Sequence, residues 1–167
     1  AGKLEGIKQG TRSGLLLEVE RLLDVAAFMG ELPKYLLLEN VRNLASKRFK
    51  PDFDKWLHKL ETLGYTNYWQ VLNAKDFGVP QNRERIYIVA FRNDIDSSGF
   101  KFPAGTNSET KIKDIMEDDV VSVKYYLSTT YLDTLKRHKE RHEAKGNGFG
   151  YEIRDINGQA GAIVCGG

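Results

Sequence analysis

The sequence is short of the residues that build disulfide frameworks and metal centres. It contains one cysteine, Cys165, and three histidines among its 167 residues. A single cysteine excludes an internal disulfide, and the scattered histidines give none of the spacings by which Cys and His hold a zinc ion. We therefore expect no bound metal.

Long hydrophobic runs and a strong net charge are also missing. No apolar run is long enough to cross a bilayer, and residues 1–5 do not form a signal peptide. A formal net charge of +2 does not by itself imply a nucleic-acid partner, so any basic surface must be local. With 41% hydrophobic and 29% charged residues, the composition excludes disordered and fibrous classes. We expect a cytoplasmic protein with no membrane partner.

The chain is long enough for one domain and part of a second. It has no initiator Met, and it stops at Gly166-Gly167 directly after a strand-like run. We therefore expect a fragment of a longer protein.

One stretch has the pattern of a strand that ends in polar residues. The apolar run Tyr-Leu-Leu-Leu at residues 35–38 is followed directly by Glu39 and Asn40. Such a short run predicts a strand buried on both faces of an α/β sheet. Ligands bind at the carboxyl ends of strands in such sheets, so Glu39 and Asn40 are candidates for a site. The alternative is that they only cap or turn the chain.

Helical patterns flank this strand. Apolar residues recur at helical spacing from Leu15 to Ala26, and a second amphipathic pattern runs from Asp52 to a stop at Gly64. The first helix leads into the strand through a short loop, as in the second half of a βαβ crossover. This arrangement predicts a parallel sheet.

Two later strand-like runs, residues 65–74 and 85–92, are joined by a connection too short for a crossover helix. We expect them to pair antiparallel, so that the sheet is mixed, with an antiparallel hairpin at one edge. The composition then turns to linker residues. We place a domain boundary after this segment, near residues 118–123, between a first domain at residues 1–120 and a second at residues 121–167.

The second domain is predicted from weaker patterns. A short helix is expected at residues 111–116 and a longer one at residues 130–144, with Tyr131, Leu132 and Leu135 facing inward. Strand-like runs at residues 149–156 and 161–165 flank Asn157-Gly158, a favoured hairpin turn.

The connection between residues 74 and 85 contains a second candidate site. Arg83 and Arg85 alternate with Glu84 at the entrance to a strand, so both arginines point to one side. Two guanidinium groups on one surface suit a phosphate or a base edge that accepts hydrogen bonds. The alternative is a solvated edge strand with Glu84 as the counter-ion.

Together, the two motifs resemble those of the DNA cytosine-5 methyltransferases. The first is Glu39-Asn40-Val41, and the second is NAKDFGVPQNRERIY at residues 73–87. The resemblance extends to about Pro103 and is looser beyond it. It implies α/β class, a partial Rossmann-like methyltransferase mixed sheet, and the start of a small, mostly β target-recognition domain. It also implies S-adenosylmethionine as cofactor and double-stranded DNA as partner. The compact spacing between the motifs looks bacterial, and both a restriction-modification enzyme and a solitary methyltransferase stay open.

The resemblance implies catalytic roles for three residues, Glu39, Arg83 and Arg85. In this family a cysteine thiolate attacks C6 of a cytosine flipped out of the duplex, and C5 then takes the methyl group. Glu39 is expected to bond N3 and the exocyclic amine, which calls for a carboxyl held partly out of water. Arg85 is expected to donate to O2, and Arg83 to hold the pocket. Asn40 is expected to orient the loops around the site.

Three more residues are implicated by the resemblance. Leu15 corresponds to an apolar residue that packs on the adenine of the cofactor, although by pattern alone it is a core leucine. Lys3 lies where the family's mobile loop reaches DNA phosphate, and Gln81 is expected to contact DNA. A lone loop lysine is more often simply solvated.

The departures from the family pattern limit the expected activity. The Gly-rich cofactor loop, the acidic ribose-binding residue and the Pro-Cys nucleophile have no match, and Cys165 is expected to be a buried, inert thiol. We expect the chain to hold the cytosine-binding half of the site and to be inactive alone.

Other interpretations remain open. One is a split enzyme with a complementary chain. Another is a DNA-binding or regulatory module that uses the basic helix at residues 130–145 and the loop at residues 46–50. We also expect self-association, or cover by another chain, along an exposed edge of the strand at residues 36–38.

Overall fold

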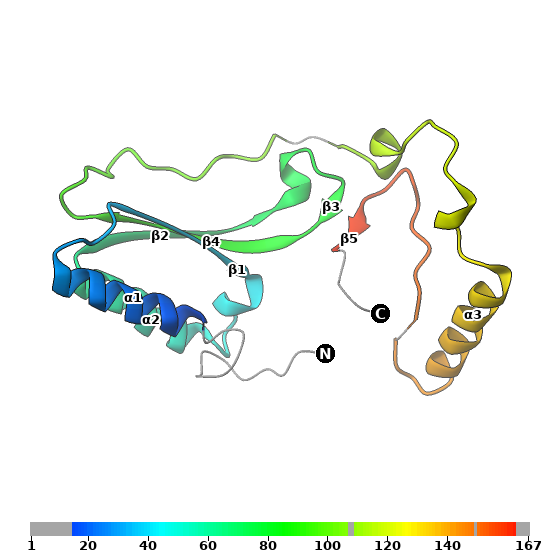
Figure 1. The fold of residues 1–167 in the computed structure, drawn as a ribbon, viewed down its shortest axis with the longest axis horizontal. Helices are drawn as coiled ribbons and strands as arrows, with labels where there is room; N and C mark the ends of the chain where they lie inside the picture. Colours follow the sequence, from blue (N-terminus) through cyan, green and yellow to red (C-terminus); the bar gives the residue numbers. More distant parts are fainter. Residues whose placement is uncertain (1–14, 107–108, 149, 163–167) are drawn as a thin grey trace.

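The computed structural model describes residues 15–106, 109–148 and 150–162. Within them, two helices lie along one face of a three-stranded sheet (Figure 1). The helices are α1 (Leu15–Met29) and α2 (Lys50–Thr62), and the strands are β1 (Tyr35–Val41), β2 (Tyr65–Asn73) and β4 (Glu84–Arg92). The prediction of an α/β arrangement is confirmed.

The helices end where the sequence predicts. Gly30 and Gly64 follow α1 and α2 with φ of 73° and 90°, a left-handed conformation that glycine adopts without steric cost. Pro51 lies in the first turn of α2, where its missing N–H is tolerated, and Asp52 beside it favours the positive end of the helix dipole.

The sheet has the order β1-β4-β2, and both pairings are antiparallel. The predicted hairpin of β2 and β4 is confirmed, with a register from Tyr65 opposite Arg92 to Asn73 opposite Glu84. Because β4 lies between them, β1 and β2 run in the same direction without pairing. Among the described strands of this sheet there is no parallel pairing, so the wider Rossmann-like sheet stays a prediction.

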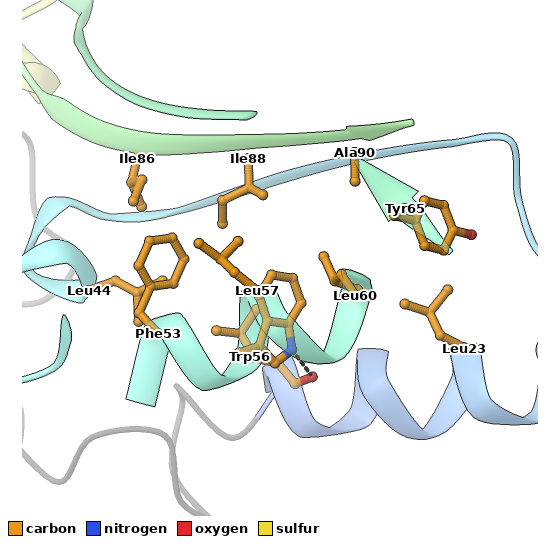
Figure 2. Close-up of a cluster of buried hydrophobic side chains, with 11 residues drawn as sticks. Leu23, Leu44, Phe53, Trp56, Leu57, Leu60, Tyr65, Ile86, Ile88 and Ala90 are labelled. Atoms are coloured by element: carbon orange, nitrogen blue, oxygen red, sulfur yellow. Dashed lines mark hydrogen bonds between the residues drawn. The ribbon is translucent and has the colours of Figure 1, made fainter. Parts of the chain in front are cut away.

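The core lies between the helices and this sheet (Figure 2). Every second residue of β4 points toward the helices, and Ile86, Ile88 and Ala90 are fully buried. Trp56 of α2 packs among them, and its indole N–H donates to the carbonyl of Leu16 in α1 at 3.1 Å. This bond joins the two helices beneath the sheet.

The prediction that β1 is buried on both faces is wrong. Leu36 and Leu38 pack against the core, whereas Tyr35 and Leu37 are 59% and 74% exposed. The cause is that α1 and α2 cover one face, while no described segment covers the other face of β1. A strand at this position therefore has one buried and one open side.

The chain after β4 returns along the sheet on the side opposite the helices (Figure 1). Aromatic rings hold it there, since Phe100 packs against Tyr68 and Phe91 with ring centroids 5.1 Å apart in both contacts. Farther along, the amide of Thr106 donates to the carbonyl of Asp76 at 2.7 Å. That contact ties the return segment to η3 (Ala74–Phe77).

The remaining elements lie beyond this segment. They are the short helices η4 (Ile112–Ile115) and η5 (Val123–Tyr125), then α3 (Thr129–Glu143), which stands apart from the sheet (Figure 1). Both predicted helices are therefore present. The prediction that the apolar residues of the longer helix face inward is wrong. Tyr131 and Leu132 are 53% and 42% exposed, and Leu135 is half-exposed.

The predicted hairpin around Asn157-Gly158 is also wrong for the described residues. The chain does turn there, but β5 (Ala160–Gly161) pairs in parallel with β3 (Gln81–Asn82), far away in sequence. The amide of Ala160 also donates to the carbonyl of Pro80 at 2.9 Å. The strand-like run that begins at residue 160 therefore pairs with residues 81–82, in the region predicted as the first domain. The domain boundary between residues 120 and 121 stays a prediction.

Candidate cytosine-binding site

The two sequence motifs meet at one end of the sheet. Because β1 and β4 are antiparallel, the carboxyl end of β1 lies beside the amino end of β4. The register places Val41 opposite Arg85, and Glu39 opposite Tyr87. Glu39 and Arg85 share the face of the sheet that points away from the helices.

Arg85 and Glu39 are joined by an ion pair. The Nε of Arg85 lies 2.9 Å from Oε1 of Glu39, and Nη1 of Arg85 donates to the carbonyl of Glu84 at 2.7 Å. The Arg85 side chain is 19% exposed and that of Glu39 is 46% exposed. The guanidinium of Arg85 is therefore held by two bonds. The carboxylate of Glu39 is more exposed to water than we expected for a carboxyl group at the end of a buried strand.

A cavity of about 420 Å³ opens over this pair. Its lining residues are Leu15, Leu16, Val19, Leu37, Leu38, Glu39, Asn40, Val41, Arg83 and Arg85. The structure thus brings Glu39, Arg83 and Arg85 to one cavity, with apolar side chains from α1 and β1 at its other end. A planar polar ring and an apolar group could both be accommodated by such a lining.

Leu15 lies on the cavity and outside the core. It is 68% exposed, whereas its neighbour Leu16 is 5% exposed. The alternative interpretation of Leu15 as a core leucine is therefore wrong. It offers an open apolar surface at the start of α1.

A second cavity, of about 670 Å³, is also lined by Arg83 and Arg85. Arg42 and Glu84 line it as well, and Nη1 of Arg42 lies 2.5 Å from Oε2 of Glu84. Glu84 is thus paired with Arg42, and β4 is the central strand of the described sheet rather than an edge. The interpretation of an edge strand with Glu84 as counter-ion to the two arginines does not hold.

The sequence matches the family model described as C-5 cytosine-specific DNA methylase over residues 1–163. The chain belongs to this family. It is 45% identical over 169 aligned residues to the type II methyltransferase M.HpaII of Haemophilus parainfluenzae, covering 100% of this chain and 46% of that relative. It is 46% identical to M2.ScrFI of Lactococcus lactis subsp. cremoris, over 71% of this chain and 31% of the relative.

The chain therefore spans less than half the length of these relatives. Solved structures support the fold: the S. pombe Dnmt2 methyltransferase aligns with a TM-score of 0.56 at 21% identity, over 83% of this chain and 41% of that one. An Entamoeba histolytica methyltransferase, EhMeth, aligns with a TM-score of 0.55 at 22% identity, over 74% and 36%.

The other residues singled out by the family resemblance are Gln81, Asn40 and Lys3, and they differ in where they lie. Gln81 is half-buried in β3, beside β5, and is not among the lining residues of the 420 Å³ cavity. Asn40 does line that cavity; it lies within β1 opposite Ile86, and its Oδ1 accepts a hydrogen bond from the amide of Val41 at 2.8 Å. Lys3 and Cys165 lie outside the described residues.

Three basic residues of the alternative DNA-binding module pair with acidic residues close by in sequence. In α3, Lys136 lies 3.7 Å from Asp133, and Lys139 lies 3.8 Å from Glu143. Lys50 pairs with Asp54 in the same way. Exposed pairs of this kind are weak, so the interpretation of α3 as a DNA-binding surface stays a prediction.

Two kinds of feature are absent from the described residues. No described helix is long and apolar enough to span a membrane. Likewise, the part of the chain with described positions holds no group of three or more His, Cys, Asp or Glu residues that could bind a metal ion.

Asn73, the first residue of the second motif, and Arg42 are two residues of this region to which the sequence assigns no role. Asn73, at the end of β2, is 9% exposed and bonds to the arginine segment. The same strand contains two other amide residues, Asn67 and Gln70, so the sequence alone gives no signal for this role. Arg42 follows the first motif directly, but its pairing with Glu84 depends on the β1–β4 register, which sequence does not reveal.

Proposed function

We propose that this chain supplies the cytosine-binding half of a DNA (cytosine-5) methyltransferase site. The reaction transfers a methyl group from S-adenosylmethionine to C5 of a cytosine flipped out of double-stranded DNA. The observation that supports this is the Glu39–Arg85 pair, 2.9 Å apart on a cavity that Arg83 also lines, in a member of the cytosine methylase family.

Glu39 and Arg85 are proposed to bind one edge of the cytosine. N3 and O2 of the ring are separated by a single carbon, so two adjacent side chains can reach both. Nucleophilic attack at C6 moves electron density onto the ring, and a carboxyl group that donates to N3 stabilises it. Arg85 donates to O2, an acceptor freed when the base leaves its pair.

Arg83 is proposed to hold the pocket from the other side. It lines the 420 Å³ and 670 Å³ cavities and a further cavity beside Tyr87 and Pro103. Because a guanidinium presents several donors in one plane, it can bond the base or a flanking phosphate without changing its position.

The apolar end of the 420 Å³ cavity fits part of the cofactor. Leu15 and Leu37 are both largely exposed there, with Leu16 and Leu38 behind them. Leu15 is proposed to pack against the adenine, which buries apolar surface that is otherwise in water. S-adenosylmethionine supplies the methyl group when bound.

The remaining proposals concern DNA and the cell. Gln81 and Lys3 are proposed DNA contacts, and residues 121–167 the start of the target-recognition domain. Since the relatives named above come from bacteria, a bacterial cytoplasmic restriction-modification enzyme is proposed.

Methyl transfer tests this function directly. In the full polypeptide that carries this sequence, transfer from labelled S-adenosylmethionine to duplex DNA is measured for wild type, Glu39→Gln and Glu61→Gln. The carboxamide of glutamine can hydrogen-bond N3 but cannot transfer a proton to it, so kcat is expected to fall by roughly 100-fold or more. Glu61→Gln, on the exposed side of α2, is the control with unchanged kcat. Equal rates for all three, or no transfer by wild type, would refute the function.

We further propose that the 167-residue chain alone does not methylate DNA, because it contains no match to the Pro-Cys nucleophile. The outer edge of β1, with Leu37 exposed, is proposed to be covered by a complementary chain or a second copy. Methyl transfer by the isolated chain would contradict the first statement. A monodisperse monomer in light scattering at high concentration would contradict the second.

A further inference from the structure

Asn73 holds an unusual position at the end of β2. It is only 9% exposed. Among residues 15–106, 109–148 and 150–162, it is the one polar residue that is buried. A buried amide group is costly unless its donor and acceptor are satisfied. Its hydrogen bonds therefore show what the position is used for.

The bonds of Asn73 go to the arginine segment. Its Oδ1 accepts from the amide of Arg83 at 2.9 Å, and its Nδ2 donates to Oδ1 of Asn82 at 2.7 Å. The next residue completes the contact, because the amide of Ala74 donates to the carbonyl of Arg83 at 3.0 Å. The backbone of Arg83 is thus bonded at both its N–H and its C=O by two successive residues.

Arg83 needs this support because it lies between two strands. It follows β3 and precedes β4, so it belongs to neither ladder. A backbone N–H in such a place has no strand partner and must find one in a side chain or water. The carboxamide of Asn73 supplies that partner.

We propose that Asn73 is a positioning residue that sets the direction of Arg83 and Arg85 in the cytosine pocket. This inference rests on the function proposed above. Bonding the peptide of Arg83 fixes where β4 begins, with Glu84 opposite Asn73. Arg85 follows at the next position and reaches Glu39 across the sheet. A shift of this segment would move both guanidinium groups together.

A purely structural role for Asn73 would be the cap of η3. Its Oδ1 does accept from the amide of Lys75, but at 3.4 Å, against 2.9 Å for the amide of Arg83. The longer bond is the weaker one. The two roles predict different behaviour at Arg83, which makes them separable.

Three variants, compared by their effect at Arg83, test the positioning role. Asn73→Ala removes every side-chain bond of this residue. Asn73→Asp keeps an oxygen for the amide of Arg83, and the amide of Asn82 can rotate to donate to it. Asn67→Ala is the matched control, since Asn67 lies in the same strand but its Nδ2 donates to the carbonyl of Leu57 in α2 at 3.0 Å.

The first readout needs no activity. Amide hydrogen exchange at Arg83 is measured by NMR in the full polypeptide that carries this sequence. We expect exchange at least about 10-fold faster in Asn73→Ala, because one hydrogen bond is lost. Asn73→Asp and Asn67→Ala are expected to leave it within about 2-fold of wild type. Equal exchange at Arg83 in Asn73→Ala and Asn67→Ala overturns the inference.

The second readout separates kcat from KM. Misplacement of Arg83 and Arg85 is expected to lower kcat in Asn73→Ala by roughly 100-fold, with KM for S-adenosylmethionine unchanged and with most of kcat retained in Asn73→Asp. A kcat for Asn73→Ala equal to that of Asn67→Ala, or Asn73→Asp as slow as Asn73→Ala, overturns the inference. Wild type without methyl transfer overturns the proposed function instead, and exchange at Arg83 still decides the position of the segment.

Discussion

Arg85 and Glu39 form a diagonal ion pair across β4 and β1, with 2.9 Å between Nε and Oε1. Neither residue is directly opposite the other in the strand register, because Arg85 faces Val41 and Glu39 faces Tyr87. Their side chains lean toward each other over the open face of the sheet. The pair therefore joins the two family motifs at a point where a ligand can reach both.

This pair is expected to contribute little to stability. The Glu39 side chain is 46% exposed, so water screens the attraction and the coupling should be below about 1 kcal/mol. A double-mutant cycle of Glu39→Ala and Arg85→Ala, followed by urea unfolding, measures it. The exposed pair Arg92–Asp94, at 2.6 Å, is the comparison. A coupling above about 2 kcal/mol would mean that the pair is structural.

The indole of Trp56 is expected to matter more than that of Trp69. Trp56 is 3% exposed and donates to the carbonyl of Leu16, so Trp56→Phe loses both ring volume and a buried hydrogen bond. We expect the free energy of unfolding to fall by about 1–3 kcal/mol. Trp69→Phe, at a position 38% exposed, should cost less than about 1 kcal/mol. Similar losses in urea unfolding would contradict the importance of the bond between α1 and α2.

The features predicted correctly from sequence have local causes. Gly30 and Gly64 end their helices through their own backbone conformations, and the connection between β2 and β4 excludes a crossover helix by its length alone. The motifs that contain Glu39, Arg83 and Arg85 are equally short, and the structure brings these residues to one cavity, while their catalytic roles stay a prediction. Each of these signals is complete within a few residues of chain.

The features that sequence did not reveal depend on distant neighbours. The exposure of Leu37 is decided by which elements cover β1, and the partner of Ala160 is Gln81 in another part of the chain. The role of Asn73 depends on an amide ten residues away in sequence. Hydrophobic periodicity describes a face of an element, but it does not show whether anything packs on that face.

Gly105 is expected to tolerate no side chain. A Cβ there would lie 2.9 Å from the carbonyl oxygen of Asp76, and backbone cannot move away as a flexible side chain would. Gly105→Ala should therefore lower the free energy of unfolding by about 1–3 kcal/mol by displacing the return segment from η3. Gly99→Ala, where nothing lies within 4 Å, is the control with a change below about 0.5 kcal/mol. Equal unfolding midpoints for the two variants would contradict this packing.

The phenol of Tyr65 is expected to make stability fall at alkaline pH. Its side chain is among the largest that are fully buried, and burial raises its pKa above 10.0, although the positive charge of Arg92 opposes the shift. The folded state therefore holds this proton more tightly than the unfolded state does. The stabilisation is complete below pH 10 and is lost as the pH rises through the pKa of the folded state.

Urea unfolding of wild type and Tyr65→Phe from about pH 8 to about pH 11 measures this effect. At the neutral end, Tyr65→Phe should be less stable by about 1 kcal/mol, because the hydroxyl no longer donates to the carbonyl of Pro33 at 2.7 Å. Since phenylalanine has no proton to lose, the variant should lose less stability than wild type as the pH rises. The gap between the two proteins should therefore shrink toward pH 11. Parallel pH profiles would show that Tyr65 does not cause the alkaline loss.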